Sequence, residues 1–296
     1  MKTASSIVAV ATGLLAVASL ANAADLPLKT SKNLAVVEAP RVASWNGLYL
    51  GVNLGYGIGQ HATSESTVAG PGIGILPAGT PIYGNGQRFD LDPRGAVGGV
   101  QVGYNWHYTP SWLLGIESDI QSSGMKRTAN CILACNTPTS IAPGLATLFP
   151  VTFNDNSAST KIDWFGTVRG RFGYVAGSTL FYATGGLAYA DIERRGSVAA
   201  RTDFILGGQI NTFEGSFNNS TTKTGWTLGF GLEGMLSPNW TLKGEYLYMD
   251  FGSITDRFDT VFTSGVSTGQ VAATRSVTSD VREHIARVGL NYKFGN

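Results

Sequence analysis

Apolar residues alternate with glycine and polar residues in eight separate segments of the chain. In the first, residues 48–58, every second residue is Leu, Val, Tyr or Ile, and glycine dominates the positions between them. A period of two residues is the signature of a β-strand with one apolar face. The same alternation returns in seven further segments, at about 99–108, 112–121, 161–174, 180–190, 226–233, 240–248 and 287–294.

The connections between these segments are of two kinds. Three are tight turns, at 109–111, 176–179 and 237–239, and four are long, at about 61–95, 122–159, 192–222 and 252–279. A soluble domain rarely carries several structureless loops of this length. Outer-membrane barrels combine short periplasmic turns with long extracellular loops. Because the number of strands is even, both termini of the chain would lie on the periplasmic side.

Aromatic residues gather where the predicted strands meet the connections. One group flanks the tight turns and the C-terminal end: Tyr108, Trp112, Tyr174, Phe181, Trp240, Tyr292 and Phe294. A second group flanks the long connections: Trp164, Tyr189, Trp226 and Tyr248. Two such groups are typical of the aromatic girdles at the two membrane interfaces.

A soluble sandwich or lipocalin-like barrel would also have alternating strands, with the apolar face inside. The glycine content of the polar face opposes this alternative, since glycine suits the crowded interior of a narrow barrel. We therefore predict an all-β fold, an eight-stranded antiparallel transmembrane β-barrel with short periplasmic turns and four long extracellular loops. Lys and Arg number 21 and Asp and Glu 20, so charge gives no support for a nucleic-acid partner.

The N-terminal segment has the features of an export signal. Lys2 precedes an apolar stretch from Ile7 to Leu20, and small residues favour cleavage between Ala23 and Ala24. We predict a signal peptide at 1–23, a periplasmic linker at 24–44 and an outer-membrane barrel at 45–296.

Four strand sequences carry a resemblance to a known family: WFGTVRGRFGY (164–174), GWTLGFGLEG (225–234), NWTLKGEYLYMDFG (239–252) and HIARVGLNYKFG (284–295). They resemble the small porin-family outer-membrane proteins of alpha-proteobacteria, often called outer-membrane immunogenic proteins and related in architecture to the OmpA barrel. The resemblance implies insertion in the cell outer membrane, contact with its lipid and lipopolysaccharide, and no catalytic residues. It also implies that the barrel-assembly machinery reads the aromatic Phe294, which Gly295 and Asn296 follow here.

Charged residues on the polar faces are the main candidate site, because a barrel turns them inward. The predicted inward acids are Glu117, Asp119, Asp163, Glu233 and Glu245, and the predicted inward bases are Lys161, Arg169, Arg171, Lys243, Arg287 and Lys293. The interior of an eight-stranded barrel is just wide enough for side chains to fill it. Charges there must pair or contact water. They would form either a plug of salt bridges or a narrow, switchable ion path.

Other candidate chemistry is sparse. Cys131 and Cys135 are four residues apart in an exported chain, which favours a small loop disulfide over a redox motif. The three histidines, His61, His107 and His284, have no metal-ligand spacing, and no nucleophile elbow accompanies them. The sequence indicates no enzyme, cofactor or metal.

Two functions follow from these patterns. The first is a non-enzymatic outer-membrane protein that supports envelope integrity and passes small solutes weakly. The alternative is a surface-binding or adhesin-like module, in which the long loops bind a host, phage or haem-type ligand or an antibody. Loop composition, rich in Ser, Thr, Asn and Gly, fits both.

Overall fold

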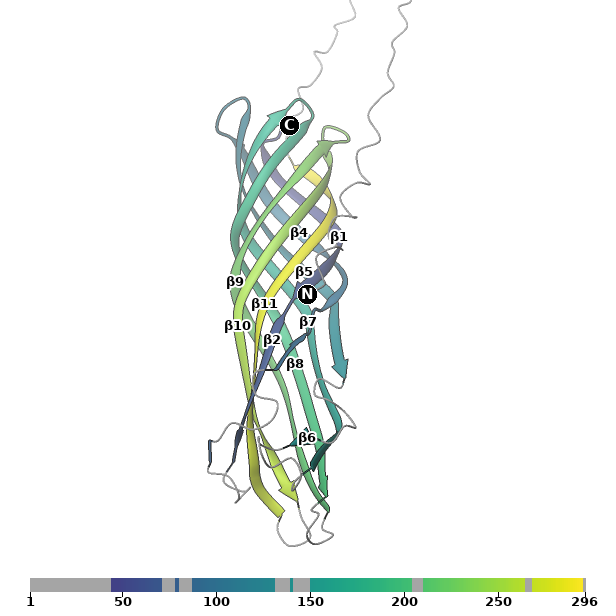
Figure 1. Cartoon of the computed structure of the whole chain (residues 1–296). Helices are drawn as coiled ribbons and strands as arrows, with labels where there is room; N and C mark the ends of the chain where they lie inside the picture. Colours follow the sequence, from purple (N-terminus) through teal and green to yellow (C-terminus); the bar gives the residue numbers. More distant parts are fainter. Residues whose placement is uncertain are drawn as a thin grey trace, which may run out of the picture. The chain divides into compact units, whose positions relative to one another are not determined.

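Eight long antiparallel strands form a closed ring. The computed structural model describes residues 44–70, 78–79, 87–130, 139–140, 150–203, 210–263 and 268–294. The ring runs in the order β1 (Gly47–Gln60), β4 (Arg94–His107), β5 (Trp112–Asn130), β7 (Pro150–Ala176), β8 (Thr179–Asp203), β9 (Ile210–Met235), β10 (Trp240–Thr263) and β11 (Thr268–Phe294). Strand β1 pairs with both β4 and β11, which closes the barrel (Figure 1). The predicted eight-stranded barrel is confirmed.

Three short strands are added outside this ring. Strand β2 (Ala62–Ala69) pairs with β11, β3 (Gln87–Asp90) pairs with β2, and β6 (Thr139–Ser140) pairs with β7. The pairing of β2 with β11 continues the sheet beyond the point where β1 ends. The predicted signal cleavage between Ala23 and Ala24, and the predicted Cys131–Cys135 disulfide, lie outside the described residues.

The three tight turns lie at one end of the barrel. They connect β4 to β5, β7 to β8 and β9 to β10, and Figure 1 shows them at the end where β11 finishes. The β7–β8 hairpin turns through Gly177 and Ser178, and Gly177 has a φ of 62°. Glycine adopts this left-handed conformation at little cost, which a two-residue hairpin needs. In outer-membrane barrels, short turns mark the periplasmic end.

At the other end the strands continue well beyond the predicted boundaries. Strands β7 to β11 contain 24 to 27 residues, whereas a barrel strand needs about 9–11 residues to cross a membrane. Much of what the sequence suggests as long loops is therefore strand. In β9 the pairing with β8 runs through the segment 216–224, which is rich in Ser, Thr and Asn. The apolar alternation ends there, although the hydrogen-bonded ladder does not.

The outer face of the barrel is apolar over a band of limited height. Leu54, Leu187 and Phe230 have exposed fractions of 69%, 67% and 64%, while their neighbours along the strand turn inward. This is the reverse of a soluble barrel and matches a surface that faces lipid. Among the described residues no helix has the length and apolar character needed to cross a membrane.

Aromatic side chains border this band at both ends. On the periplasmic side, the Trp112 and Phe172 ring centroids are 4.8 Å apart and the rings are nearly parallel. On the extracellular side, the centroids of Trp164 and Tyr189 are 5.9 Å apart. The aromatic residues therefore pair across neighbouring strands where the two membrane interfaces are expected.

Candidate functional site: the filled barrel interior

The charged side chains of the barrel interior form one cluster, which we call the charged layer. It contains four carboxylates and four cations, each buried: Glu117, Asp119, Glu233, Glu245, Arg169, Arg171, Lys243 and Arg287. They come from two sets of neighbouring strands, β5 with β7 and β9 with β10 and β11, whose inward faces meet across the closed barrel. Formal charge in the layer therefore sums to zero.

Arg169 lies at the centre of the charged layer. Its guanidinium donates to three carboxylates: Nη2 to Glu117 at 2.5 Å and to Asp119 at 2.9 Å, and Nη1 to Glu245 at 3.0 Å. Its Nε donates to the Thr167 hydroxyl at 2.9 Å, which itself donates to Asp119. The planar, multi-donor guanidinium is suited to such bridging. Arg169 thus joins carboxylates from two strands, β5 and β10.

Two further cations contact the same carboxylates. Arg287 donates from Nη2 to Asp119 at 2.8 Å and from Nε to Glu245 at 2.7 Å. Lys243 donates from Nζ to both oxygens of Glu117, at 2.9 and 3.0 Å. Each carboxylate in this group therefore faces at least two cations, which compensates for the loss of hydration.

Two tyrosines connect the remaining arginine to this group. Arg171 donates to Glu233 at 2.7 Å and to the Tyr49 hydroxyl at 2.6 Å, and the Tyr49 hydroxyl donates to Glu117 at 2.6 Å. The Arg171 guanidinium also lies 3.9 Å from the centroid of the Tyr182 ring, a cation–π distance. Tyr182 in turn donates to Glu245 at 2.9 Å.

Buried amides surround the charged layer on the side of β1 and β4. Asn53 donates to Gln101 at 3.0 Å, and Gln101 donates to Asn291 at 2.5 Å. Asn291 donates to Glu233 at 2.7 Å, which joins this chain of amides to the charges. Hydrogen bonds therefore fill the lumen from one wall to the other.

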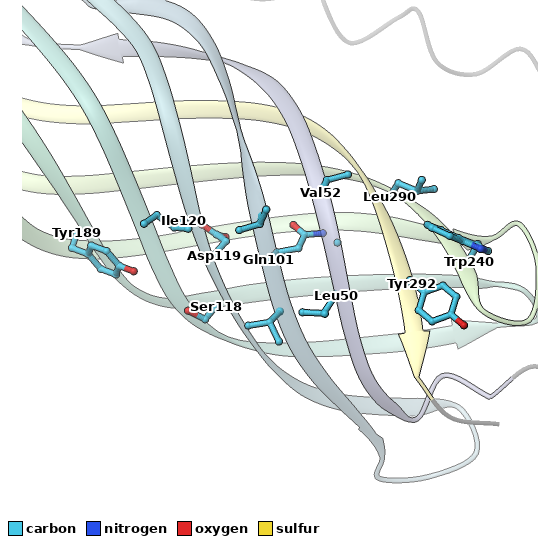
Figure 2. Close-up of a pocket in the computed structure, with 13 residues that line it drawn as sticks. Leu50, Val52, Gln101, Ser118, Asp119, Ile120, Tyr189, Trp240, Leu290 and Tyr292 are labelled. Atoms are coloured by element: carbon cyan, nitrogen blue, oxygen red, sulfur yellow. The ribbon is translucent and has the colours of Figure 1, made fainter.

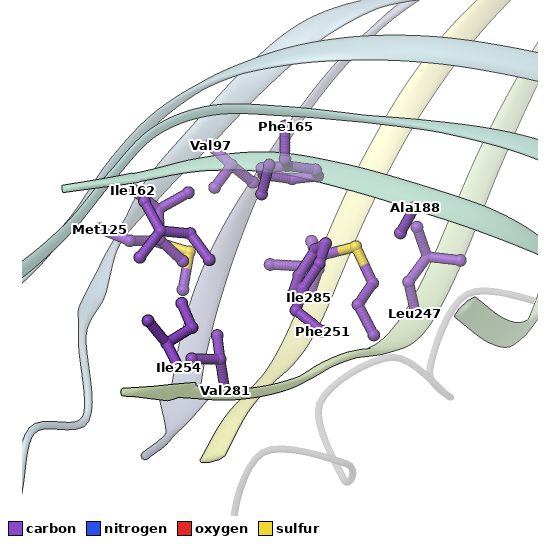
Figure 3. Close-up of a cluster of buried hydrophobic side chains, with 13 residues drawn as sticks. Val97, Met125, Ile162, Phe165, Ala188, Leu247, Phe251, Ile254, Val281 and Ile285 are labelled. Carbon is purple, nitrogen blue, oxygen red and sulfur yellow. The ribbon is translucent and has the colours of Figure 1, made fainter. Parts of the chain in front are cut away.

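Above the charged layer, toward the extracellular end, the lumen is filled by hydrocarbon. Figure 3 shows this apolar layer, whose members are Val97, Met125, Ile162, Phe165, Ala188, Ala190, Ile192, Leu247, Met249, Phe251, Ile254, Val281 and Ile285. They reach inward from six strands of the ring, β4, β5, β7, β8, β10 and β11. One polar pair lies at the same height: His61 Nε2 is 2.6 Å from Glu283 Oε1, and Glu283 stands between Val281 and Ile285 on β11.

Polar residues fill the strand extensions beyond the apolar layer. Arg194 forms an ion pair with Asp256 at 2.6 Å and donates to the Ser279 hydroxyl at 2.9 Å. Burial lowers the pKa of Arg194, and the Asp256 carboxylate acts in the opposite direction. A second buried pair joins Arg275 to Glu65 of β2. The ion pairs offset part of the cost of removing these charges from water.

A small apolar cluster closes the periplasmic end of the lumen. Trp45, Leu113, Leu180 and Tyr182 are buried together there. Lys293 lies at this end, with its Nζ 5.3 Å from the centre of the Trp45 ring and 2.5 Å from the Ser44 carbonyl oxygen. Lys293 is thus buried as predicted by its position, but it is not part of the charged layer.

The prediction of inward orientation is wrong for Lys161 and Asp163. Both are on the outer surface, where they form an ion pair with each other and have exposed side-chain fractions of 47% and 38%. A β-bulge shifts the register of β7 between Ile162 and Trp164. The extra residue reverses the alternation, so that Ile162 turns inward while Trp164 stays on the outer face with Tyr189.

Sequence reasoning missed the apolar layer and the two bridging tyrosines. A signal for the layer is present at 246–249, where Tyr246, Leu247, Tyr248 and Met249 are apolar or aromatic on both faces. Such a run breaks the rule that only the lipid-facing side is apolar. Within the described ranges, no three His, Cys, Asp or Glu side chains converge on a position suited to a metal ion.

The hollow drawn in Figure 2 lies along the wall of β1, β4, β5 and β11, with Tyr189 at one end. Its lining includes Leu50, Val52, Val100 and Ile120, all exposed on the outer face. This hollow therefore belongs mainly to the lipid-facing surface and offers no polar site comparable to the charged layer.

Comparison with known proteins agrees with this architecture. A family model described as an outer membrane protein beta-barrel domain matches residues 8–294. The 31 kDa outer-membrane immunogenic protein of Brucella melitensis is 35% identical over 254 residues, which cover 85% of this chain and 84% of that protein. The 22 kDa outer membrane protein of Rhizobium leguminosarum is 26% identical, with 73% and 70% covered.

Among solved structures, Ail of Yersinia pestis in complex with the heparin analogue sucrose octasulfate aligns with a TM-score of 0.33 and 14% identity, over 84% of this chain and 99% of that one. The relatives in Brucella and Rhizobium confirm the resemblance drawn from the strand sequences. The chain belongs to the outer-membrane β-barrel protein family and is a protein of the outer membrane.

Proposed function

We propose that the protein is a non-enzymatic structural component of the outer membrane, and that its barrel conducts solutes far more weakly than a wide porin does. The observation that carries this proposal is the filled lumen. Side chains of the charged layer and of the apolar layer occupy it at successive heights. Water-filled channels belong to barrels with many more strands.

The two layers oppose permeation for different reasons. An ion that entered the charged layer would have to separate paired groups such as Arg169 and Glu117, which would lose their partners without regaining hydration. An ion that reached the apolar layer would lose its hydration shell against Phe165 and Leu247 without any replacement ligand. The alternative of a switchable ion path requires both layers to rearrange.

Envelope support is tested by complementation of a strain that lacks the protein. A structural role requires the barrel alone, so a variant without residues 131–149 should restore detergent resistance as well as the full chain does. The variant's folding is checked by heat-modifiable migration in SDS, because a closed barrel keeps its strand edges paired until it is boiled. A variant that folds but fails to restore resistance would contradict the structural role.

A second candidate function is surface binding, and the strand extensions favour it. In β9, the segment Asn218–Thr222 is exposed and lies on the extracellular side of the aromatic Trp226. Such extensions would hold the extracellular connections away from the membrane, where a host, phage or haem-type ligand or an antibody can reach them. Binding of such a ligand to whole cells should then be lost in the variant without residues 131–149, while detergent resistance is kept.

We also propose that the barrel-assembly machinery recognises Phe294. This residue ends β11, opposite Leu48, and has an exposed fraction of 45% on the lipid-facing side. A Phe294→Ala variant should accumulate less folded protein in the outer membrane. The matched control is Phe181→Ala, which removes another exposed aromatic residue, at 52%, from the periplasmic end of β8.

A further inference from the structure

Three basic side chains stand next to one another on the outer face of β4, β5 and β7. Arg94 is directly opposite Lys126, and Lys126 is directly opposite Lys161. All three residues are exposed, and their strand neighbours Met125 and Ile162 point inward. Directly opposite residues on one face have Cβ atoms about 4.5–5.5 Å apart, and like charges there destabilise the sheet.

The acids near this basic row are already engaged. Asp163 is paired with Lys161, and Glu193, which is opposite Lys161 on β8, is paired with Arg195. Arg94 and Lys126 form no ion pair with any residue in the described part of the chain. A third outward acid, Asp191 on β8, accepts a hydrogen bond from Ser220. The four bases Arg94, Lys126, Lys161 and Arg195 exceed the three acids by one charge.

The row lies just beyond the extracellular edge of the apolar band. Lys161 is three residues from Trp164, toward the extracellular end of β7, and Trp164 pairs with Tyr189 in the aromatic girdle. At about 3.3 Å per residue, Lys161 lies about 10 Å along the strand from Trp164. This position is at the level of the lipid headgroups and not of the acyl chains.

On the periplasmic side of Arg94 and Lys126, the outer surface of the barrel carries only small side chains. The outward positions there are Ala96 and Gly98 on β4 and Ser122 and Gly124 on β5. A Cβ atom added to Gly124 would meet nothing closer than the Ala96 carbonyl oxygen, at 3.5 Å. Further toward the periplasm, the wall becomes apolar.

These observations fit a ligand with an anionic head and an apolar body. We propose that Arg94, Lys126 and Lys161 bind the phosphate-bearing headgroup of a lipid in the outer leaflet, with part of its apolar body on the small outward residues of β4 and β5. The anion would offset the repulsion between cations that face each other. This assignment is independent of whether the lumen conducts.

Strand β11, which β1 separates from β4, offers a matched control. Arg282 on β11 is also exposed, but it lies 3.4 Å from Asp250 and 3.9 Å from Asp280. Because two acids surround it, Arg282 has no surplus positive charge for a lipid phosphate.

Native mass spectrometry of the refolded full-length barrel, titrated with diphosphorylated lipid A, tests the proposal. The double variant Arg94→Gln/Lys126→Gln should bind about 30-fold more weakly than wild type, from the usual contribution of two basic residues near an anionic surface. The single variant Arg282→Gln should stay within about twofold of wild type. Heat-modifiable migration in SDS establishes that each variant is folded.

Four outcomes would overturn the proposal. The first is equal affinity of wild type and the double variant for lipid A, and the second is equal weakening in Arg282→Gln. The third is equal affinity of wild type for lipid A and for its dephosphorylated form. Inorganic phosphate is used as a competitor: displacement of lipid A at equimolar phosphate would mean that the row binds free phosphate and not a lipid.

Discussion

The charged layer and the apolar layer fill the same lumen by opposite means. In the charged layer, Arg169, Arg287 and Lys243 each contact more than one carboxylate. Most of these contacts are directional hydrogen bonds, so they require each donor to point at its acceptor. In the apolar layer, Phe165 and Leu247 pack without directional bonds. The first layer therefore depends on which groups are present, and the second depends mainly on how much volume they occupy.

This difference follows from the narrow ring of strands. The inward side chains of β11 are buried in the lumen, whether the residue is Arg287 or Ile285. A charge in that position needs a partner from another strand, while a hydrocarbon side chain needs only close contact. The comparison predicts that the two layers respond differently to truncation and to conservative substitution.

The largest effect is expected in the charged layer. Arg169→Ala removes one cationic partner from each of Glu117, Asp119 and Glu245 and leaves the charged layer with one uncompensated negative charge. The free energy of unfolding should fall by about 3–5 kcal/mol. Urea unfolding in lipid vesicles, followed by tryptophan fluorescence, measures this change. A loss below about 1 kcal/mol would mean that the layer is hydrated and that its charges are screened.

Truncation in the apolar layer should also be costly, through lost volume. Met125→Ala removes a fully buried side chain of the apolar layer, so the free energy of unfolding should fall by about 2–5 kcal/mol. The same urea experiment measures it. If Met125→Ala proved neutral, the layer would be loosely packed rather than filled.

A smaller loss is expected for the hydroxyl that links Arg171 to Glu117. Tyr49→Phe keeps the ring but removes an oxygen that accepts from Arg171 and donates to Glu117. Leaving these buried groups with one partner fewer should cost about 1–3 kcal/mol. The control is Tyr56→Phe, whose ring lies on the lipid-facing surface with an exposed fraction of 52%. Equal losses in the two variants would remove any special role of the Tyr49 hydroxyl.

The smallest effect is expected for a substitution that conserves side-chain volume in the apolar layer. Leu247→Met conserves volume in the apolar layer and should cost less than about 1.5 kcal/mol. Arg169→Lys conserves charge in the charged layer but removes the planar fork, so it should cost clearly more than Leu247→Met. The lipid-facing Leu228→Val variant sets the baseline for both. Equal costs for Leu247→Met and Arg169→Lys would contradict the distinction between the layers.

The barrel and most of the charged layer follow from the period of two in the sequence. Once strands are aligned in the order of the chain, the positions between lipid-facing residues must point inward, and this places Glu117, Arg169 and Arg287 in the lumen. The even number of strands and the tight turns then determine which end is periplasmic.

Two features could not be obtained from that rule. The bulge in β7 shifts the alternation by one residue and has no marker in the sequence, so the period of two places Lys161 and Asp163 on the wrong face. Inward hydrocarbon, as in Met249 and Ile285, looks like ordinary strand sequence unless both faces are compared. Contacts such as Arg169 with Glu245 join residues 76 positions apart, which only the closed sheet brings together.

Single-channel conductance of the refolded protein in planar bilayers tests the filled lumen most directly. With the charged layer and the apolar layer both in place, the wild-type protein should give no stable openings comparable to those of a sixteen-stranded porin. Arg169→Ala combined with Met125→Ala opens space in both layers and should raise the conductance of barrels that remain folded. Large, stable wild-type channels that are unchanged in the double variant would contradict a filled lumen and indicate a diffusion pore.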